Sequence, residues 1–172
     1  AIVCDSEPAS ELSEGKKGIV VLDKTPFYAV SGGQIGDSGI IKTEFGEFVV
    51  SNTTKNPDGV YMHYGVVTSG KIDINSNACA KVDALRRHSI MRNHTAAHLL
   101  QNALRKVLGT HVEQAGQEVT DLRLRFDFTH FSAMTPEEIK TVEKIVNDEI
   151  LNSIEVKTEV LPIEEAKKRG AM

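Results

Sequence analysis

The pattern of apolar residues changes near residue 85, and this change decides which elements each side can form. Before it, short apolar runs rich in β-branched or aromatic residues alternate with Gly, Asn, Asp and Pro, which is typical of strands joined by tight turns. The predicted strands are residues 18–23, 27–30, 39–42, 47–51, 60–67 and 78–83. Several short strands at close spacing indicate a small barrel or sandwich over residues 1–85.

After residue 85 the apolar residues recur at the spacing of a helix. A helix is predicted over residues 86–108, and Gly109 stands where a C-terminal cap belongs. Its apolar positions are Leu100, Ala103, Leu104 and Val107. Alternating apolar and charged residues over 122–128 then predict a half-buried strand.

A second helix is predicted to begin after Thr135, since Pro136 suits a first turn and Glu138 completes a capping box. Its buried stripe consists of Ile139, Val142, Ile145, Val146 and Ile150. Residues 155–160 read as a further strand and 162–169 as a short helix. The chain is therefore expected to have an α+β fold in two parts, residues 1–85 and 86–172.

Composition excludes several function classes. Twenty basic and 24 acidic residues give a net charge of −4, which argues against a large, uniformly basic surface. Tryptophan is absent and aromatic residues make up 5%, so a broad base-stacking platform is not expected. A local basic cluster remains, and its members are Arg86, Arg87 and Arg92. These arginines either contact RNA phosphates or form an ordinary solvated helix start.

The cysteines and the apolar runs bear on the compartment. Cys4 and Cys79 form no Cys-x-x-Cys pair, which is unlike a disulfide-rich secreted domain. The apolar stretches are far shorter than the roughly 18 residues of a membrane span. Asp5 and Glu7 interrupt the stretch where a signal peptide would have its apolar core. We expect a cytoplasmic protein with no membrane partner.

The sharpest chemical feature is His94-Thr95-Ala96-Ala97-His98. On a helix, residues four apart lie on one face, so the two imidazoles can converge on one metal ion. Thr95 stands where a zinc peptidase would carry its glutamate, so that class is excluded. A zinc site needs a third protein ligand and often a fourth, and nothing in the sequence visibly completes this one. Two surface histidines by chance is the alternative.

A glycine-rich loop, Ser31-Gly32-Gly33-Gln34-Ile35-Gly36-Asp37-Ser38-Gly39, follows the apolar run 27–30. It has neither the Lys-Ser/Thr of a P-loop nor a Gly-x-Gly-x-x-Gly pattern, so it is not a nucleotide-binding motif of either kind. One reading is a tight connection between strands, where glycine supplies positive φ. The other is a loop whose bare backbone lets a ligand approach closely.

Five separated motifs occur together in a recognisable order. They are Thr25-Pro26-Phe27-Tyr28-Ala29-Val30-Ser31-Gly32-Gly33-Gln34, then Arg92-Asn93-His94-Thr95-Ala96-Ala97-His98-Leu99-Leu100, then Gly109-Thr110-His111-Val112-Glu113-Gln114, then Leu124-Arg125-Phe126-Asp127-Phe128, and Ala133-Met134-Thr135-Pro136-Glu137-Glu138-Ile139. In this order they resemble the editing region of bacterial alanyl-tRNA synthetases, over about residues 18–172.

The resemblance implies a fold, a function and site residues. It implies a small β-barrel followed by a two-layer α/β editing domain, with helices against an antiparallel sheet. It implies zinc-dependent hydrolysis of the ester in alanine-specific tRNA mischarged with serine or glycine, within a synthetase that ligates alanine to its tRNA with ATP. The residues implied are His94 and His98 as zinc ligands, Gln114 at the reacting group, and Ser31, Gly32, Gly33 and Gln34 near the substrate.

Three departures from the family pattern are visible. The family's other two zinc ligands come from a Cys-x-x-x-His motif beyond Met172, so the site is expected to be incomplete and the fragment weak or inactive alone. Relatives often carry Thr at Ala97, and Glu or Thr at Val30, where a polar residue is associated with serine selection. The alternatives are a freestanding trans-editing protein and a tRNA-binding module without chemistry.

Overall fold

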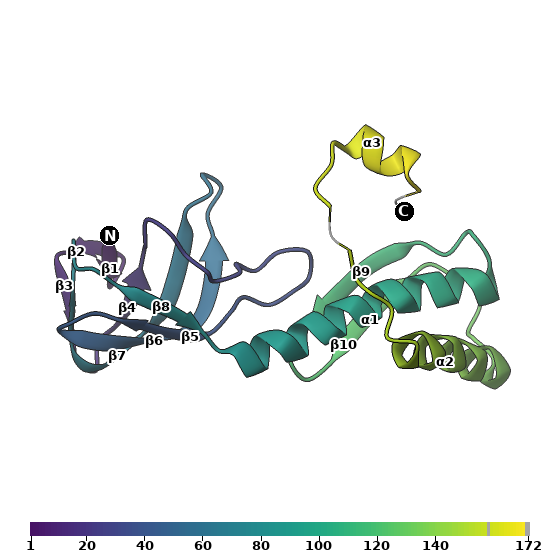
Figure 1. Cartoon of the computed structure of the whole chain (residues 1–172), viewed down its shortest axis with the longest axis horizontal. Helices are drawn as coiled ribbons and strands as arrows, with labels where there is room; N and C mark the ends of the chain where they lie inside the picture. Colours follow the sequence, from purple (N-terminus) through teal and green to yellow (C-terminus); the bar gives the residue numbers. More distant parts are fainter. Residues whose placement is uncertain (158, 171–172) are drawn as a thin grey trace.

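The computed structural model describes residues 1–157 and 159–170. The strands before residue 83 gather at one end of the molecule, and a long helix, α1 (Ala84–Leu108), runs from them to the other end (Figure 1). The change of pattern near residue 85 is therefore the start of α1. Among the described helices, none is both long enough and apolar enough to cross a bilayer.

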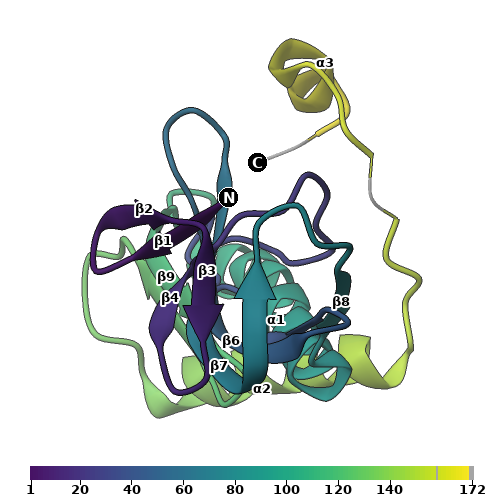
Figure 2. The same ribbon diagram turned by 90° about the vertical axis from the view of Figure 1, so that its left-hand side faces the viewer.

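The first part is an antiparallel sheet of eight strands. Its path runs β2-β1-β4-β7-β6-β5-β8, and β3 pairs with the far half of β7. The strands are β1 (Ile2–Cys4), β2 (Glu7–Ala9), β3 (Glu11–Ser13), β4 (Lys17–Val20), β5 (Gly39–Lys42), β6 (Gly46–Lys55), β7 (Tyr61–Asp73) and β8 (Cys79–Val82). Seen end-on, they curl around an interior (Figure 2). The described strands form no ring, so the expected barrel is an open, curled sheet.

Strand alternation explains the core of this part. One face of each strand points inward, and the buried residues are Ile2, Leu12, Val20, Phe27, Ile41, Phe48, Val50, Val67 and Ile72. The strand predicted over 27–30 is wrong. Phe27 and Ala29 are buried in alternation, but the segment pairs with no described strand, and the Val30 N–H alone donates to β6, at the Thr53 carbonyl, within the described part of the chain. Burial alone therefore produced the alternating pattern there.

Helix α1 begins and ends as the sequence predicts, within two residues. The Asp83 side chain accepts a hydrogen bond from the Arg86 N–H and caps the first turn. Gly109, with φ 117°, donates its N–H to the Arg105 carbonyl and ends the helix.

The second part packs on the far half of α1. A hairpin of β9 (Gln114–Val119) and β10 (Leu124–Phe128) lies along α1, and α2 (Pro136–Leu151) lies against α1 as well (Figure 1). The core between them contains Ala103, Leu104, Val112 and Val142, with Leu100, Val107, Phe126, Phe128, Ile145 and Val146 at its edge. The α+β class, the antiparallel sheets and the helices against them are confirmed. Strand β9 escaped the sequence analysis.

The last described segment differs from the expectation. Helix α3 (Ile163–Lys168) is present, but the described residues of 155–160 form no strand, and residue 158 lies outside the described ones. Val156 and Val160 are exposed, and no described strand pairs with this segment, so its alternating pattern does not mark a strand. Figure 1 draws α3 apart from the two packed parts.

Candidate functional site

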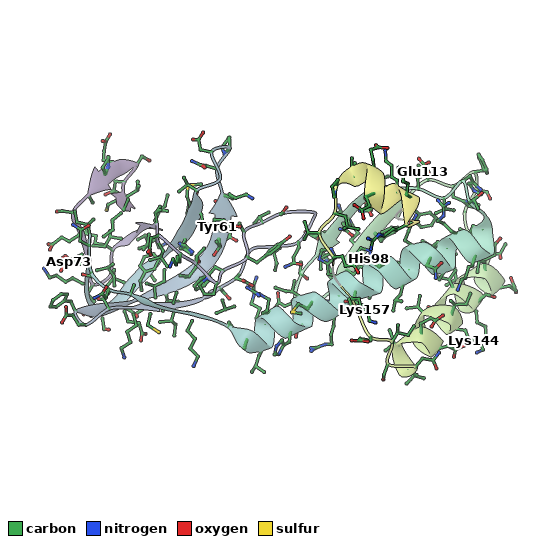
Figure 3. All side chains as sticks on the ribbon, turned by 45° about the horizontal axis from the view of Figure 1, so that its top comes forward. Tyr61, Asp73, His98, Glu113, Lys144 and Lys157 are labelled. Atoms are coloured by element: carbon green, nitrogen blue, oxygen red, sulfur yellow. The ribbon has the colours of Figure 1, made fainter. Side chains whose placement is uncertain are left out.

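The paired histidines lie midway along α1, as predicted, and Figure 3 labels His98 at that position. Their rings are stacked nearly parallel, with centroids 5.5 Å apart and 8° between the planes. His98 is exposed and His94 is partly buried. Burial, and the neighbouring charge of His98, lower the pKa of His94, so its imidazole is neutral near pH 7.

The glycine-rich loop is bound to the β9 end of the second part. The Val119 N–H donates to the Gly33 carbonyl at 2.8 Å, and the Ile35 N–H donates to the Val119 carbonyl at 3.1 Å. The Gln117 side-chain amide donates to the Gly32 carbonyl at 2.6 Å. The loop of the first part is therefore an extension of the hairpin of the second.

This arrangement brings the loop to the histidines. Gln34 Oε1 lies 2.7 Å from His94 Nδ1, although the two residues are 60 apart in sequence. The Gln34 side chain is buried, whereas Ser31, Gly32 and Gly33 are exposed. The loop and the histidine helix therefore lie together, and an exposed stretch of glycine backbone lies at this junction.

Strand β9 gives the junction a third wall and positions Gln114. At one end of β9 the Asn93 side chain donates to the Thr120 carbonyl at 2.8 Å. Near the other end Gln101 and Arg105 both donate to the Val112 carbonyl. Strand β9 therefore runs antiparallel to α1, past both histidines. Gln114, the first residue of β9, is exposed and follows two residues after Val112, whose carbonyl is bound by Gln101 and Arg105 of α1.

The three arginines singled out in the sequence have different surroundings. Arg87 donates to both carboxylate oxygens of Asp37, which is 1% exposed, and to the Pro26 carbonyl. Arg86 donates to the Gly36 carbonyl at 2.9 Å and lies 3.6 Å from Asp121. Arg92 is exposed, and among the described residues it hydrogen-bonds to Ser89 alone. Two of the three guanidinium groups thus hold the loop and hairpin to α1.

Sequence reasoning missed Asp37, Asn93 and Gln117, which hold the junction together. No periodic pattern marks them, because their partners are backbone groups or side chains far away in sequence. One sequence signal could have indicated Asp37. It is a lone acidic residue inside a glycine-rich loop with no basic residue nearby in sequence, so its partner must be distant in sequence.

The donor chemistry of the junction suits two ligands of a metal ion. Two neutral imidazoles a helical turn apart are suitable nitrogen ligands for zinc. Across the described residues, no group of three or more His, Cys, Asp or Glu side chains is placed to hold a metal. The pair therefore fits as one edge of a tetrahedral site. A cavity of about 570 Å³ lies elsewhere, over β1, β4, β6 and β7.

Comparison with known proteins identifies the family. The model for "tRNA synthetases class II (A)" matches residues 1–86, which is half of the 172-residue chain. The chain belongs to this family. The match of the class II (A) model ends in the first turn of α1, just before the histidines.

Bacterial alanine–tRNA ligases are similar to this class II (A) chain over its whole length. The ligase of Pseudomonas entomophila (strain L48) is 49% identical over 172 residues, all of this chain and 20% of the relative. That of Dechloromonas aromatica (strain RCB) is 51% identical over the same span. That of Pseudoalteromonas translucida (strain TAC 125) is 49% identical over 171 residues. The resemblance to bacterial alanyl-tRNA synthetases is confirmed, and the chain spans about a fifth of these relatives' length.

Proposed function

We propose that this chain is the editing region of an alanine–tRNA ligase, which hydrolyses the aminoacyl ester of alanine-specific tRNA mischarged with serine or glycine. The observation that most directly supports this proposal is the contact between Gln34 of the glycine-rich loop and His94 of α1. It joins two motifs that are distant in sequence at one exposed junction. A pocket that activates alanine cannot strongly reject glycine or serine, so a second hydrolytic site is needed.

The chain's own residues would supply binding and orientation. The exposed backbone of Ser31, Gly32 and Gly33 allows close approach of the aminoacyl end, because two of the three residues carry no side chain. Gln114 does not titrate, so its task is to hydrogen-bond the substrate or the attacking water. Arg92 remains for an RNA phosphate, since Arg86 and Arg87 hold the junction.

His94 and His98 would hold the zinc ion as two of its ligands. When bound, zinc supplies Lewis acidity that polarises an ester carbonyl or lowers the pKa of a water molecule. With two ligands of the usual three or four, we expect weak zinc binding and slow deacylation by this chain alone. The remaining ligands would come from the Cys-x-x-x-His motif that the family resemblance implies.

The test compares this chain with a longer one that continues through the implied Cys-x-x-x-His motif. Zinc per molecule is measured after dialysis, and serine release is measured from mischarged tRNA. The longer chain should retain zinc and deacylate, and His98→Ala in it should abolish zinc retention. If the 172-residue chain retains one zinc and deacylates at the rate of the longer form, the incomplete-site argument is wrong.

Two other functions remain as outcomes of the same test. A longer chain that binds mischarged tRNA without releasing serine would be a tRNA-binding module. Full activity of the 172-residue chain without any extension would favour a freestanding trans-editing protein. We further propose that residues 1–85 form a loop-bearing domain and residues 86–172 a histidine-bearing editing domain, with helix α1, capped by Asp83, beginning at this boundary. The substrate implies a cytoplasmic location.

A further inference from the structure

The Gln34 side chain has a role that differs from substrate binding. We propose that Gln34 is a positioning residue, which holds His94 as the Nδ1–H tautomer and leaves the lone pair of Nε2 available to a ligand. This inference deepens the proposed function and rests on it for the identity of that ligand. The contact that carries it is the 2.7 Å separation of Gln34 Oε1 and His94 Nδ1.

The chemistry of the two groups determines the tautomer. A neutral imidazole has one nitrogen that donates and one that accepts. An amide oxygen only accepts, so a hydrogen bond to Gln34 Oε1 requires the proton to lie on Nδ1 of His94. The proton is then absent from Nε2. Histidine ligands of metals are usually oriented in this way, by an acceptor on the other ring nitrogen.

Burial and backbone contacts hold Gln34 in place for this purpose. The residue is 6% exposed. Its N–H donates to the Ser31 carbonyl at 2.9 Å, and its carbonyl accepts from the Ser31 N–H at 3.2 Å. The flanking Gly33 and Ile35 are bonded to Val119 on either side. Because backbone hydrogen bonds hold Gln34 and the residues on either side of it, the position of its side chain is fixed before any ligand binds. A positioning residue requires this.

The same observations argue against direct substrate contact by Gln34. Its amide oxygen is already engaged by His94, and its side chain is buried. Ser31, Gly32 and Gly33 are exposed on the same loop. The loop therefore divides into an exposed backbone stretch and one buried side chain directed at the histidine.

The experiment reads the tautomer of His94 directly, from the nitrogen chemical shifts of the imidazole ring by NMR. The full 172-residue chain is used without metal at about pH 9, where histidine is neutral. We expect the wild-type His94 to be mostly Nδ1–H. An Nε2–H ring in the wild type would overturn the proposal without any variant, so the test does not depend on a variant that folds.

Three variants assign the effect to Gln34. Gln34→Met keeps the length and removes the acceptor, so His94 should lose its preference and become a mixture of tautomers. Gln34→Glu, which can only accept when ionised, should restore Nδ1–H. Gln117→Met removes another glutamine that binds the loop, at Gly32, and should leave His94 unchanged. The proposal is contradicted if the tautomer of His94 does not change in Gln34→Met, or if it becomes Nε2–H in Gln34→Glu.

The outcome is separable from that of the proposed function, since no metal and no tRNA are present. A wild-type Nδ1–H tautomer in a protein whose longer form never deacylates would leave the inference standing and remove the proposed function. In a longer chain that does bind zinc, Gln34→Met should lower the zinc affinity about 10-fold or more, as loss of such outer partners does.

Discussion

His63 is fully buried in the first part, and both of its ring nitrogens have partners. Nδ1 lies 2.8 Å from the Val20 carbonyl, and Nε2 lies 2.8 Å from Thr25 Oγ1. Burial lowers its pKa below the ordinary value of 6.5 and outweighs the hydrogen bond to Val20. The ring is held neutral because a protonated imidazole at this place would lie out of water between two fixed groups.

Stability should therefore depend on pH through His63. Its folded pKa is lowered, so below about pH 6.5 the unfolded chain binds more protons than the folded one. The contribution is fully present above that pH and is lost as the pH falls. Urea unfolding of wild type, His63→Gln and the exposed-site control His88→Gln should show a weaker pH dependence in His63→Gln alone. Equal slopes for all three would contradict the assignment.

Two neighbouring glycines share a left-handed backbone conformation but differ in how closely other atoms surround them. Gly32 and Gly33 have φ of 58° and 76°, in the left-handed region. A Cβ on Gly32 would meet nothing within 4 Å, whereas a Cβ on Gly33 would lie 2.5 Å from the Gln117 carbonyl oxygen. Glycine is needed at position 32 for the turn alone. At position 33 it is needed for the turn and also for the close approach of the loop to β9.

Alanine substitution should separate the two requirements. Gly32→Ala should cost about 1 kcal/mol, the penalty of a left-handed side-chain-bearing residue. Gly33→Ala should cost more, because it also pushes the loop away from Gln117. Exchange of the Val119 amide, which donates to Gly33, should speed up in Gly33→Ala only. Equal exchange in both variants would show that the loop does not need this close approach.

At the scale of elements, α2 illustrates a start specified by local chemistry. The Thr135 side chain accepts from the Glu138 N–H at 3.2 Å, and the Glu138 carboxylate accepts from the Thr135 N–H at 2.8 Å. The hydrogen bonds that the Thr135 N–H and hydroxyl donate to the carboxylate lower the pKa of Glu138. Because every partner is within three residues, the capping box was readable from the sequence.

Removal of the Thr135 cap should destabilise the chain. Thr135→Ala should lower the free energy of unfolding by about 1 kcal/mol, since the Glu138 N–H of the first turn loses its side-chain acceptor. Thr141→Ala, an exposed threonine inside α2, is the matched control and should change stability by less than about 0.5 kcal/mol. A Thr135 effect no larger than the Thr141 effect would rule out a stabilising cap.

Elements with local signals were predicted, and those with distant partners were not. Helix α1 was predicted within two residues because its periodicity and its Gly109 end are both local signals. Strand β9, Gln-Ala-Gly-Gln-Glu-Val, has almost no apolar alternation, because its neighbours are β10, the loop and α1. At the site, the histidine pair was visible by its spacing. The Gln34 contact was not, because it spans 60 residues.

At the scale of the whole molecule, an ion pair between the buried Asp37 carboxylate and the partly exposed Arg87 links the two parts. Asp37 is 1% exposed, and its carboxylate accepts from Arg87 of α1 and, at 2.6 Å, from the Tyr28 N–H. Removing one partner of such a pair leaves an uncompensated charge and costs about 3 kcal/mol or more. An exposed pair, Lys144 with Asp148 on α2, should contribute about 0.5 kcal/mol or less.

The prediction contrasts these two pairs by urea unfolding. Asp37→Asn should destabilise the chain by about 3 kcal/mol, and Asp148→Asn by about 0.5 kcal/mol or less. Asp37→Asn should also speed amide exchange in both parts, since both use the junction. Exchange that rises only in residues 1–82 would mean that the second part is stable without the first.

The loop, the arginine pair and Gln34 together mean that the sequence boundary near residue 85 is a poor place to divide this protein. A chain that starts at α1 would keep both histidines but lose the Gln34 amide that bonds to His94 and the carboxylate that balances Arg87. A chain that stops before α1 would keep Asp37 buried without its cation. Mixing the two half-chains should therefore restore the Gln34–His94 and Asp37–Arg87 contacts that neither half can make alone. A chimera between relatives should take residues 31–37 and the histidine helix from the same parent.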